Sequence, residues 1–194
     1  MERPQLTHPP VHEKAALRSV LGAFATGVTV VTAGGDFAHG MTANSFASVS
    51  LDPPLILICV GRGAVMHRVL EEQTAFAVSI LAADQTDVAR YFADKRRPIG
   101  REQFDAVSWS PGEHSGAPLI DGALAHLECE LEHRHEAGDH TIYVGRLLSL
   151  WRRPGDDALV FLNGRFLRGE RPPDPVLAQS NQLPLRPTRP ADAA

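Results

Sequence analysis

Two long stretches of alternating apolar and polar residues constrain the fold of this chain more than any other feature. Residues 125–131 place an apolar side chain at every odd position and a histidine or glutamate at every even one. This is the pattern of a half-buried β-strand. Residues 142–151 form the expected return strand, and the turn between the two stretches contains Gly138-Asp139-His140. A long antiparallel hairpin is therefore predicted.

Shorter strands and a few helices complete the predicted pattern. Asn163-Gly164 separates two apolar runs and is typical of a two-residue type I′ hairpin turn. Asp52-Pro53-Pro54 interrupts the preceding strand pattern, because proline removes a ladder donor. Strands are predicted at residues 28–33, 55–60, 76–81, 159–162 and 165–168, and helices at residues 12–24, 65–73 and 85–94, the last with Asp84 as its N-cap.

These elements predict a mainly β fold. The number of short strands and the short connections between them favour an antiparallel barrel with a few covering helices over a parallel βαβ array. A length of 194 residues fits one domain with its own core. We expect a flexible N-terminal tail over residues 1–11, the domain over residues 12–169, and a proline-rich C-terminal tail over residues 170–194.

The composition argues against several classes of protein. A formal net charge of -4 gives no basic surface for nucleic acid. The longest apolar run, residues 55–60, is far shorter than the roughly 20 residues of a membrane-spanning helix. The N-terminus carries charges and prolines in place of a signal-peptide core, so a cytoplasmic location is expected. Cys59 and Cys129 lack a Cys-x-x-Cys spacing and are predicted to be free thiols in the core.

An uncharged polar run covers residues 40–50. Its hydrogen-bonding side chains are Thr42, Asn44, Ser45, Ser48 and Ser50. Neutral donors and acceptors match the edges of a flat, uncharged ligand such as the isoalloxazine ring of a flavin, without burying an unpaired charge. The alternative is a surface loop rich in Ser and Thr, since such clusters between periodic segments are ordinarily loops.

Three motifs in order give the chain a resemblance to a known family. The polar run is preceded by residues 24–32 (FATGVTVVT) and followed much later by Gly138-Asp139-His140. With these motifs the chain resembles the flavin reductase family over residues 17–168, and more narrowly the small reductase partners of two-component flavin monooxygenases. The resemblance implies the Greek-key split β-barrel of FMN-binding proteins and a homodimer with the flavin site near the subunit interface.

The resemblance also implies a set of cofactor-binding residues. Main-chain groups are expected to make many of the hydrogen bonds. The phosphates are expected where the strand over residues 55–60 ends and the next helix begins, because a helix N-terminus presents free N–H groups to anions. The residues expected at the flavin are His39, Gly40, Met41, Thr42, Asn44, Ser45, Ser48, Ser50, Cys59, Val60, Gly61, Val65, Met66 and Phe92.

One departure from the family pattern concerns the choice of flavin. The family commonly has Asn, Ser and Thr where this chain has Gly61, Ala64 and Met66. The loss of three side-chain partners weakens a site for the terminal phosphate of FMN. We therefore expect FAD, with FMN possible, because backbone N–H groups can hold the pyrophosphate while the adenine finds contacts elsewhere.

The resemblance assigns contacts with NADH to His140 and Phe166. The alternatives are a hairpin-tip histidine bonded to its neighbour Asp139, and an aromatic residue of the core. Because hydride passes between two cofactors, no catalytic side chain is expected. The sequence contains neither Gly-x-Gly-x-x-Gly nor a P-loop, so the nicotinamide is expected to stack directly on the flavin.

Two charged or metal-like clusters have simpler explanations. Lys95-Arg96-Arg97 could meet a cofactor phosphate, but a charge cluster after a helix is more often a solvated face or a partner of the helix dipole. His133 and His135 lie on one side of a strand, as in some metal sites, but no third ligand follows at a useful spacing. No metal is expected.

The sequence thus predicts an NADH-dependent flavin reductase that reduces FAD and supplies the reduced flavin to a separate monooxygenase. Two alternatives use the same fold. One is a non-enzymatic flavin or haem carrier, and the other is an FMN oxidase of the pyridoxamine-phosphate oxidase type, which the weak phosphate motif disfavours. An interaction module built on the proline-rich tail would leave the polar run unexplained.

Overall fold

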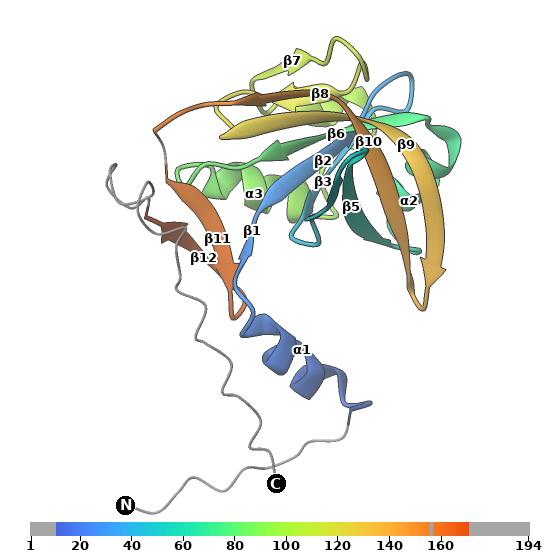
Figure 1. Cartoon of the computed structure of the whole chain (residues 1–194). Coiled ribbons are helices and arrows are strands. Elements are labelled where there is room, and N and C mark those ends of the chain that lie inside the picture. The colour runs from blue at the N-terminus through green and yellow to red at the C-terminus, as the bar shows by residue number, and fades with distance from the viewer. Residues whose placement is uncertain (1–10, 156, 171–194) are drawn as a thin grey trace, which may run out of the picture.

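The computed structural model describes residues 11–155 and 157–170. The two predicted tails fall almost entirely outside these residues, so the domain boundaries stay a prediction. Within the described residues the chain is mostly β-structure with a few helices, as predicted (Figure 1). The helices are α1 (Lys14–Gly22), α2 (Val65–Glu72), α3 (Thr86–Ala93) and the short 3-10 helix η1 (Arg101–Phe104).

All strand pairs are antiparallel. The strands are β1 (Thr26–Gly27), β2 (Thr29–Ala33), β3 (His39–Ala43), β4 (Ala47–Leu51), β5 (Pro54–Gly61), β6 (Ala75–Ile80), β7 (Trp109–Pro111), β8 (Pro118–Ile120), β9 (Ala125–Ala137), β10 (His140–Arg152), β11 (Ala158–Leu162) and β12 (Arg165–Gly169). A seven-stranded sheet has the order β3-β2-β6-β9-β10-β5-β4, and two smaller sheets have the orders β1-β11-β12 and β7-β8.

Both predicted hairpins are confirmed. Ala137 pairs with His140, which leaves Gly138 and Asp139 as the two turn residues between β9 and β10. Leu162 pairs with Arg165 across Asn163-Gly164, whose φ angles of 48° and 75° lie in the left-handed region that a type I′ turn requires. The two strands of the long hairpin are neighbours in the interior of the seven-stranded sheet.

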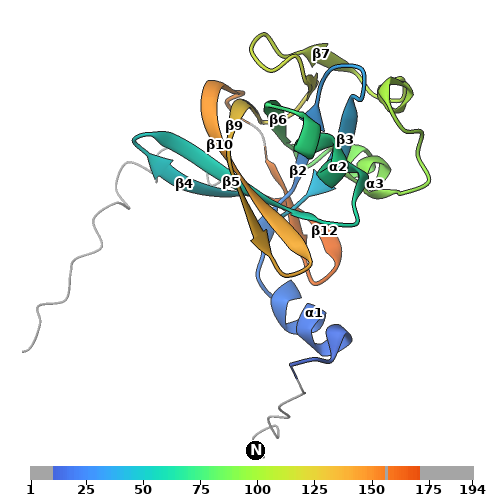
Figure 2. The same ribbon diagram turned by 90° about the vertical axis from the view of Figure 1, so that its right-hand side faces the viewer.

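Two hydrophobic clusters form the core. One lies between the sheet and α2, and contains Tyr143, Met66 and Leu70, all fully buried. The other centres on Phe92 of α3 and Phe104 of η1, whose ring centroids are 5.6 Å apart. Figure 2 shows α2 and α3 beside β3, which both helices contact. The edge strand β3 is therefore enclosed by two helices, while β4 at the other edge of the sheet is largely exposed.

The uncharged polar run is not a loop. Its first part belongs to β3 and its second part to β4, which are the two opposite edges of the seven-stranded sheet. The alternative of a Ser/Thr-rich surface loop is therefore wrong. The sequence pattern does not distinguish an edge strand from a surface loop, because both are exposed to solvent and therefore carry polar residues.

The first helix differs most from its prediction. α1 is shorter than the predicted residues 12–24, because its C-cap is already Ala23. None of its residues is buried, and Leu17, Val20, Leu21 and Phe24 are all exposed. In Figures 1 and 2 the helix projects away from the sheets. Its apolar stripe therefore has no partner within the described chain.

Two local predictions are also wrong. Asp84 does not cap α3, because Gln85 takes the N-cap position. The Gln85 side chain instead links the backbone of Ala82, whose N–H donates to Oε1, to the carbonyl of Asp121. Residues 100–119, where the sequence pattern predicts no helix or strand, contain η1, β7 and the first part of β8.

Candidate active site

Two adjoining cavities of about 300 Å³ each lie beside β3. The first, here called the main groove, is bounded by β3, the start of α2 and the segment after α3. Six residues predicted to bind cofactor line it: His39, Met41, Thr42, Val65, Met66 and Phe92. Seven further residues line the main groove. Five of them are not among the predicted cofactor contacts: Gly63, Ala64, Ala93, Pro98 and Ile99. The other two are Lys95 and Arg97, for which the sequence favours a solvated face.

The second cavity, here called the side pocket, continues from the main groove along α2. Its lining residues are Phe37, His39, Val65, Arg68, Val69, Glu72, Gln73, Ile99 and Gly100. Three of them, His39, Val65 and Ile99, also line the main groove. The two cavities therefore share a wall.

Gly40 lets β3 pack closely against α3. A Cβ atom at this position would lie 2.6 Å from Cε1 of Phe92, closer than real contacts allow, and 3.3 Å from Cε1 of Phe104, a tight contact. The Gly40 N–H donates to Oε1 of Gln103 at 2.9 Å, and its carbonyl accepts from Nη2 of Arg97. Both main-chain groups of this predicted flavin contact are thus already bonded within the protein.

A buried histidine stands at the wall shared by the two cavities. His39 is 4% exposed, and its two ring nitrogens lie 3.1 Å from Nε2 of Gln103 and 3.2 Å from Nη2 of Arg97. Gln103 is fully buried, and its amide also makes hydrogen bonds to the backbone of Gly40, Ala38 and Gly100. Burial, and next the Arg97 charge, lower the pKa of His39 to about 4, so the ring is neutral at physiological pH.

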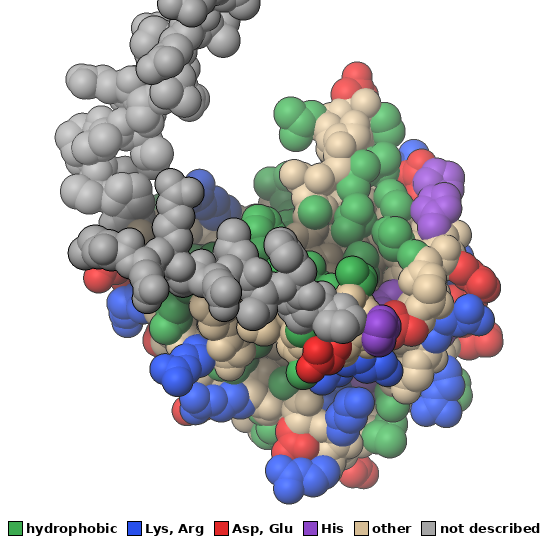
Figure 3. Space-filling view, turned by 90° about the horizontal axis from the view of Figure 1, so that it is seen from below, with side chains coloured by type: hydrophobic (Ala, Val, Ile, Leu, Met, Phe, Trp, Pro, Cys, Tyr) green, Lys and Arg blue, Asp and Glu red, His purple; other side chains and the backbone are tan. Residues whose placement is uncertain are grey.

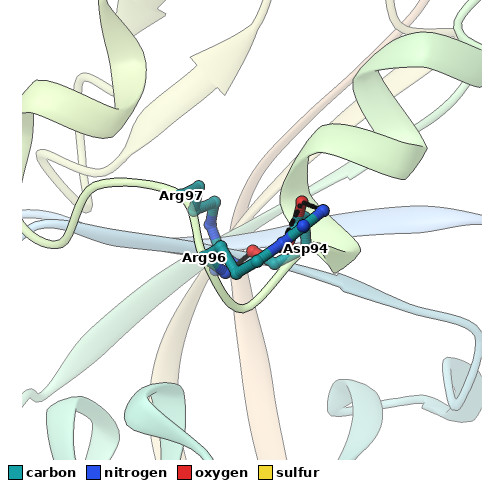
Figure 4. A network of polar contacts seen from close by, with 3 residues as sticks. All are labelled: Asp94, Arg96 and Arg97. Carbon is teal, nitrogen blue, oxygen red and sulfur yellow. Dashed lines mark hydrogen bonds and ion pairs between the residues drawn. The ribbon is translucent and has the colours of Figure 1, made fainter.

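The turn after α3 positions Arg97. The Arg96 guanidinium donates to both carboxylate oxygens of Asp94, at 3.0 Å to Oδ1 and 2.8 Å to Oδ2, and the Arg96 backbone N–H also donates to Oδ1 (Figure 4). These hydrogen bonds hold the pKa of the Asp94 carboxyl at about 2. Arg97 donates to the Asp94 carbonyl at 2.7 Å and reaches β3 with its other nitrogen. The predicted solvated face is therefore correct for Arg96 but wrong for Arg97.

Most polar side chains of the run bind the protein itself. Thr42 donates to the Ala89 carbonyl of α3 at 2.7 Å. Ser45 donates to the Cys59 carbonyl and accepts from its N–H, which fixes the chain between β3 and β4 to β5. Asn44 donates to the hydroxyl of Thr26, and Ser50 accepts from the N–H of Asp52. Ser45, Asn44, Ser48 and Ser50 do not line either cavity, so their assignment to the flavin stays a prediction.

The start of α2 offers backbone groups instead of side chains. Its N-cap residue, Ala64, makes no side-chain hydrogen bond, so the first-turn N–H groups have no capping partner. The side chains of Met66 and Val60 are fully buried in the core, and only their main chains could meet a ligand. Cys59, predicted to lie in the core, is only half buried, whereas Cys129 is fully buried as predicted.

His140 lies beside Gly61, two residues before Gly63 of the main groove. As the first residue of β10 it pairs with Gly61 at the end of β5, and its Nε2 lies 3.6 Å from where a Gly61 Cβ would stand. Its Nδ1 is 2.7 Å from the carboxylate of Asp139. The bond to Asp139 that is expected of a simple hairpin-tip histidine is therefore present, while the other ring nitrogen, Nε2, faces the end of β5.

Three other candidate residues, Phe166, His133 and His135, line neither cavity. Phe166 packs against Phe161, with ring centroids 5.4 Å apart, and borders the second core cluster. The rings of His133 and His135 lie 5.8 Å apart on β9. Among residues 11–155 and 157–170, no three His, Cys, Asp or Glu side chains are grouped as metal ligands would be.

The chain is similar to several flavin reductases. It matches the family model of the flavin reductase like domain over residues 21–170. An "NADH-dependent FAD reductase" of Streptomyces globisporus is 56% identical over 156 residues, which cover 80% of this chain and 86% of that protein. An "NADH-dependent flavin reductase" of Rhodococcus sp is 44% identical over 167 residues, which cover 84% of this chain and 87% of that protein.

Solved structures agree with this similarity. The NADH:FAD oxidoreductase SgcE6 of Streptomyces globisporus C-1027 superposes with a TM-score of 0.83 at 52% identity, covering 87% of this chain and all of that one. BorF, the flavin reductase component of a bacterial two-component tryptophan halogenase, gives a TM-score of 0.80 at 52% identity over 82% of this chain and 100% of BorF. None of the described helices is long and apolar enough to span a bilayer. The chain belongs to the family of flavin reductase-like domains, as the sequence motifs predicted.

Proposed function

We propose that this chain is an NADH-dependent flavin reductase that transfers a hydride from NADH to FAD and delivers the reduced flavin to a separate monooxygenase. One observation carries the proposal: the main groove, in a chain of this family, is lined by uncharged residues together with two cations. Met41, Thr42 and Phe92 are among the uncharged residues, and Lys95 and Arg97 are the cations. This arrangement suits a flat neutral ring joined to phosphates.

The residues of the groove bind and orient rather than react. FAD, when bound, supplies the hydride acceptor and NADH the donor, so the protein contributes proximity and electrostatics. Gly40, held by Gln103 and Arg97, fixes the edge strand against which the ring would lie. A rigid edge strand keeps the reacting partners in one geometry, which is the main source of rate in such a transfer.

The first turn of α2 is the proposed place of the phosphates. Its uncapped N–H groups and the helix dipole favour an anion. Lys95 lines the same groove, is exposed, and has no hydrogen bond or ion pair within the part of the chain that the structure describes. The absent hydroxyl side chains at positions 64 and 66 are thus replaced by main-chain donors and a cation.

His140 is the proposed contact for NADH. Its position beside Gly61 supports this role, because the exposed face of the ring borders the strand that leads into the main groove. Asp139 holds Nδ1 at 2.7 Å and so orients the ring. For Phe166 the packing against Phe161 favours the alternative role in the core, and we assign it no contact with NADH.

A homodimer of split barrels is the proposed assembly. The exposed apolar residues of α1, together with Leu51 at the end of β4, are typical of a surface that another chain covers. In Figure 3, hydrophobic side chains gather on the face of the molecule seen from below. A second copy of this chain is the proposed occupant, which would bury the apolar stripe that α1 leaves exposed.

The partner enzyme and the location complete the proposal. One relative, 37% identical over 152 residues, is named as the reductase subunit HsaB of a flavin-dependent monooxygenase of Mycobacterium tuberculosis. We assign this chain the same kind of partner, in the cytoplasm, where NADH is supplied.

Steady-state oxidation of NADH tests the proposed function. The purified protein should accelerate the loss of NADH absorbance when FAD is present, relative to FAD without protein and to protein without FAD. A flavin or haem carrier would leave the rate at the level without protein. An oxidase of the pyridoxamine-phosphate type would instead consume oxygen with pyridoxamine phosphate and without NADH.

A further inference from the structure

Arg97 lines the main groove as a cation that no carboxylate contacts. Within the described residues its guanidinium makes no ion pair. Its hydrogen bonds go to the carbonyls of Asp94 and Gly40 and to the side-chain oxygen of Gln103, and its remaining polar neighbour is the His39 ring, 3.2 Å away. That ring is neutral at physiological pH, because its pKa is about 4. The cluster around Arg97 therefore keeps one full positive charge beside the groove.

The acidic residue of the same turn does not neutralise this charge. The Asp94 carboxylate attracts Arg97 through space, but it is bonded to the Arg96 guanidinium at 2.8 Å and 3.0 Å. Burial is the largest influence on Arg97 and lowers its pKa, yet a guanidinium stays charged in proteins. A half-buried charge without a counter-ion is unfavourable, so a negative group of a ligand in the groove is stabilised near Arg97.

The proposed reaction creates such a negative group. In NADH + FAD → NAD⁺ + FADH⁻, a hydride, which is one proton with two electrons, leaves the nicotinamide and joins the flavin ring. The ring changes from neutral to singly negative, while the charge of the phosphates stays the same. We propose that Arg97 supplies the positive charge that stabilises the reduced ring, an inference that rests on the proposed function.

The position of Arg97 fits the ring better than the phosphates. Its Cζ lies 5.8 Å from the centroid of the Phe92 ring, and both side chains line the main groove. Its Nη2 contacts Gly40 and His39 of β3, the edge strand against which the ring is proposed to lie. Lys95, by contrast, is exposed and is the cation proposed for the phosphates. The two cations of the groove thus serve different parts of the ligand.

The guanidinium is fixed before a ligand enters, since the hydrogen bonds to Asp94, Gly40 and Gln103 all lie within the protein. A fixed charge needs no reorganisation when negative charge develops beside it. The groove should therefore bind reduced FAD more tightly than oxidised FAD. For a two-electron couple, each tenfold change in the ratio of the two dissociation constants corresponds to about 30 mV in the midpoint potential of the bound flavin.

The dissociation constants of oxidised and reduced FAD test the inference. Anaerobic reduction by dithionite makes the test independent of NADH. For Arg97→Gln, the Kd for reduced FAD should rise roughly tenfold more than the Kd for oxidised FAD, as for a nearby charge that water partly screens. The midpoint potential of bound FAD should then fall by about 30 mV. Arg97→Lys, which keeps the charge, should restore most of the lost potential.

Two other cations provide controls. Lys95→Ala should raise the Kd for both redox states by the same factor and leave the potential unchanged, because the phosphates carry the same charge in both states. Arg90, an exposed cation paired with Asp87, does not line the main groove. Arg90→Gln should change neither dissociation constant.

The unaltered protein offers a second measurement that needs no variant. Reduced flavin in water binds a second proton just below neutral pH, and a fixed cation opposes that proton. At about pH 6 the potential of bound FAD should therefore change by about 30 mV per pH unit, the value for one proton taken up with two electrons. The titratable groups beside Arg97 are His39, Tyr91, Asp94, Lys95 and Arg96. Only histidine ordinarily changes charge near about pH 6, and the pKa of His39 is about 4.

The outcomes distinguish a charge effect from a structural one. Equal losses of affinity for the two redox states in Arg97→Gln would make Arg97 a mere support of Gly40 and overturn the inference, and so would unchanged constants. Twice the expected slope with pH would also overturn it, because the reduced ring would then be neutral. A protein that binds FAD as inferred but does not oxidise NADH would contradict the proposed function alone. A protein that binds no flavin would overturn both.

Discussion

Replacing His39 by Asn should remove the contribution of this residue to the acid sensitivity of the protein. The His39 ring is buried, and its pKa falls from an ordinary 6.5 to about 4. Because the folded state resists protonation, the unfolded state binds more protons between these two values. The stability contributed by the neutral ring is complete above about pH 6.5 and is lost as the pH falls toward about 4.

The magnitude follows from these two pKa values. At about pH 5, protonation of His39 shifts the unfolding equilibrium toward the unfolded state by a factor of roughly 30, which equals about 2 kcal/mol. Between about pH 7.5 and about pH 5, the free energy of unfolding of the unaltered protein should therefore fall by about 2 kcal/mol more than that of His39→Asn. All other titrating groups are shared by the two proteins and cancel in this difference.

Urea unfolding at the two pH values, followed by fluorescence at one protein concentration, measures the difference. A fixed concentration is needed because dimer dissociation would otherwise contribute. His126, which is only partly buried and bonds the Ile120 carbonyl, provides a matched control as His126→Asn. The reasoning is refuted if His39→Asn and the unaltered protein lose the same stability within about 0.5 kcal/mol.

Three further outcomes are expected. His140→Ala should raise the KM for NADH while the affinity for FAD in a fluorescence titration changes less than about twofold; equal changes in both would exclude the proposed role. Gly40→Ala should lower the free energy of unfolding by about 1–3 kcal/mol, because the new Cβ meets the Phe92 ring, whereas Gly27→Ala, with open space around it, should be nearly neutral. Leu21→Glu should shift the sedimentation of a dimer to that of a monomer; a monomeric unaltered protein would contradict the proposed assembly.

Local patterns were sufficient to predict the framework of the fold. The β9–β10 hairpin follows from strict alternation, and the turn at Asn163-Gly164 follows from its need for two left-handed residues. Both are short-range effects of backbone sterics and of burial on one face. The framework of antiparallel strands was therefore accessible from the sequence.

α1 shows where a local pattern is incomplete. Its apolar periodicity was interpreted correctly as a helix, but the partner of that apolar stripe is absent from the described chain. Periodicity indicates that a face will be covered and does not say by what. The length of α1 and the orientation of its apolar stripe depend on contacts with residues outside the helix, which the periodicity of the helix does not reveal.

The site depends on contacts between residues far apart in the sequence. Gln103 was not singled out, because a glutamine in an apparently irregular segment gives no signal of its own. Arg97 looked like one cation among three, and only the fold shows that it reaches β3. The hydroxyls of Thr42 and Ser45 were expected at a ligand, yet α3 and β5 already take their hydrogen bonds.

Anaerobic mixing of the protein with FAD and NADH tests the central claim most directly, because hydride transfer itself is then observed without oxygen or a partner enzyme. With a catalytic amount of protein, the absorbance of oxidised FAD should disappear with consumption of one NADH per FAD, far faster than in buffer alone. NADH carrying deuterium at the transferred position should slow the bleaching in a single turnover. Bleaching no faster than in buffer would contradict the account.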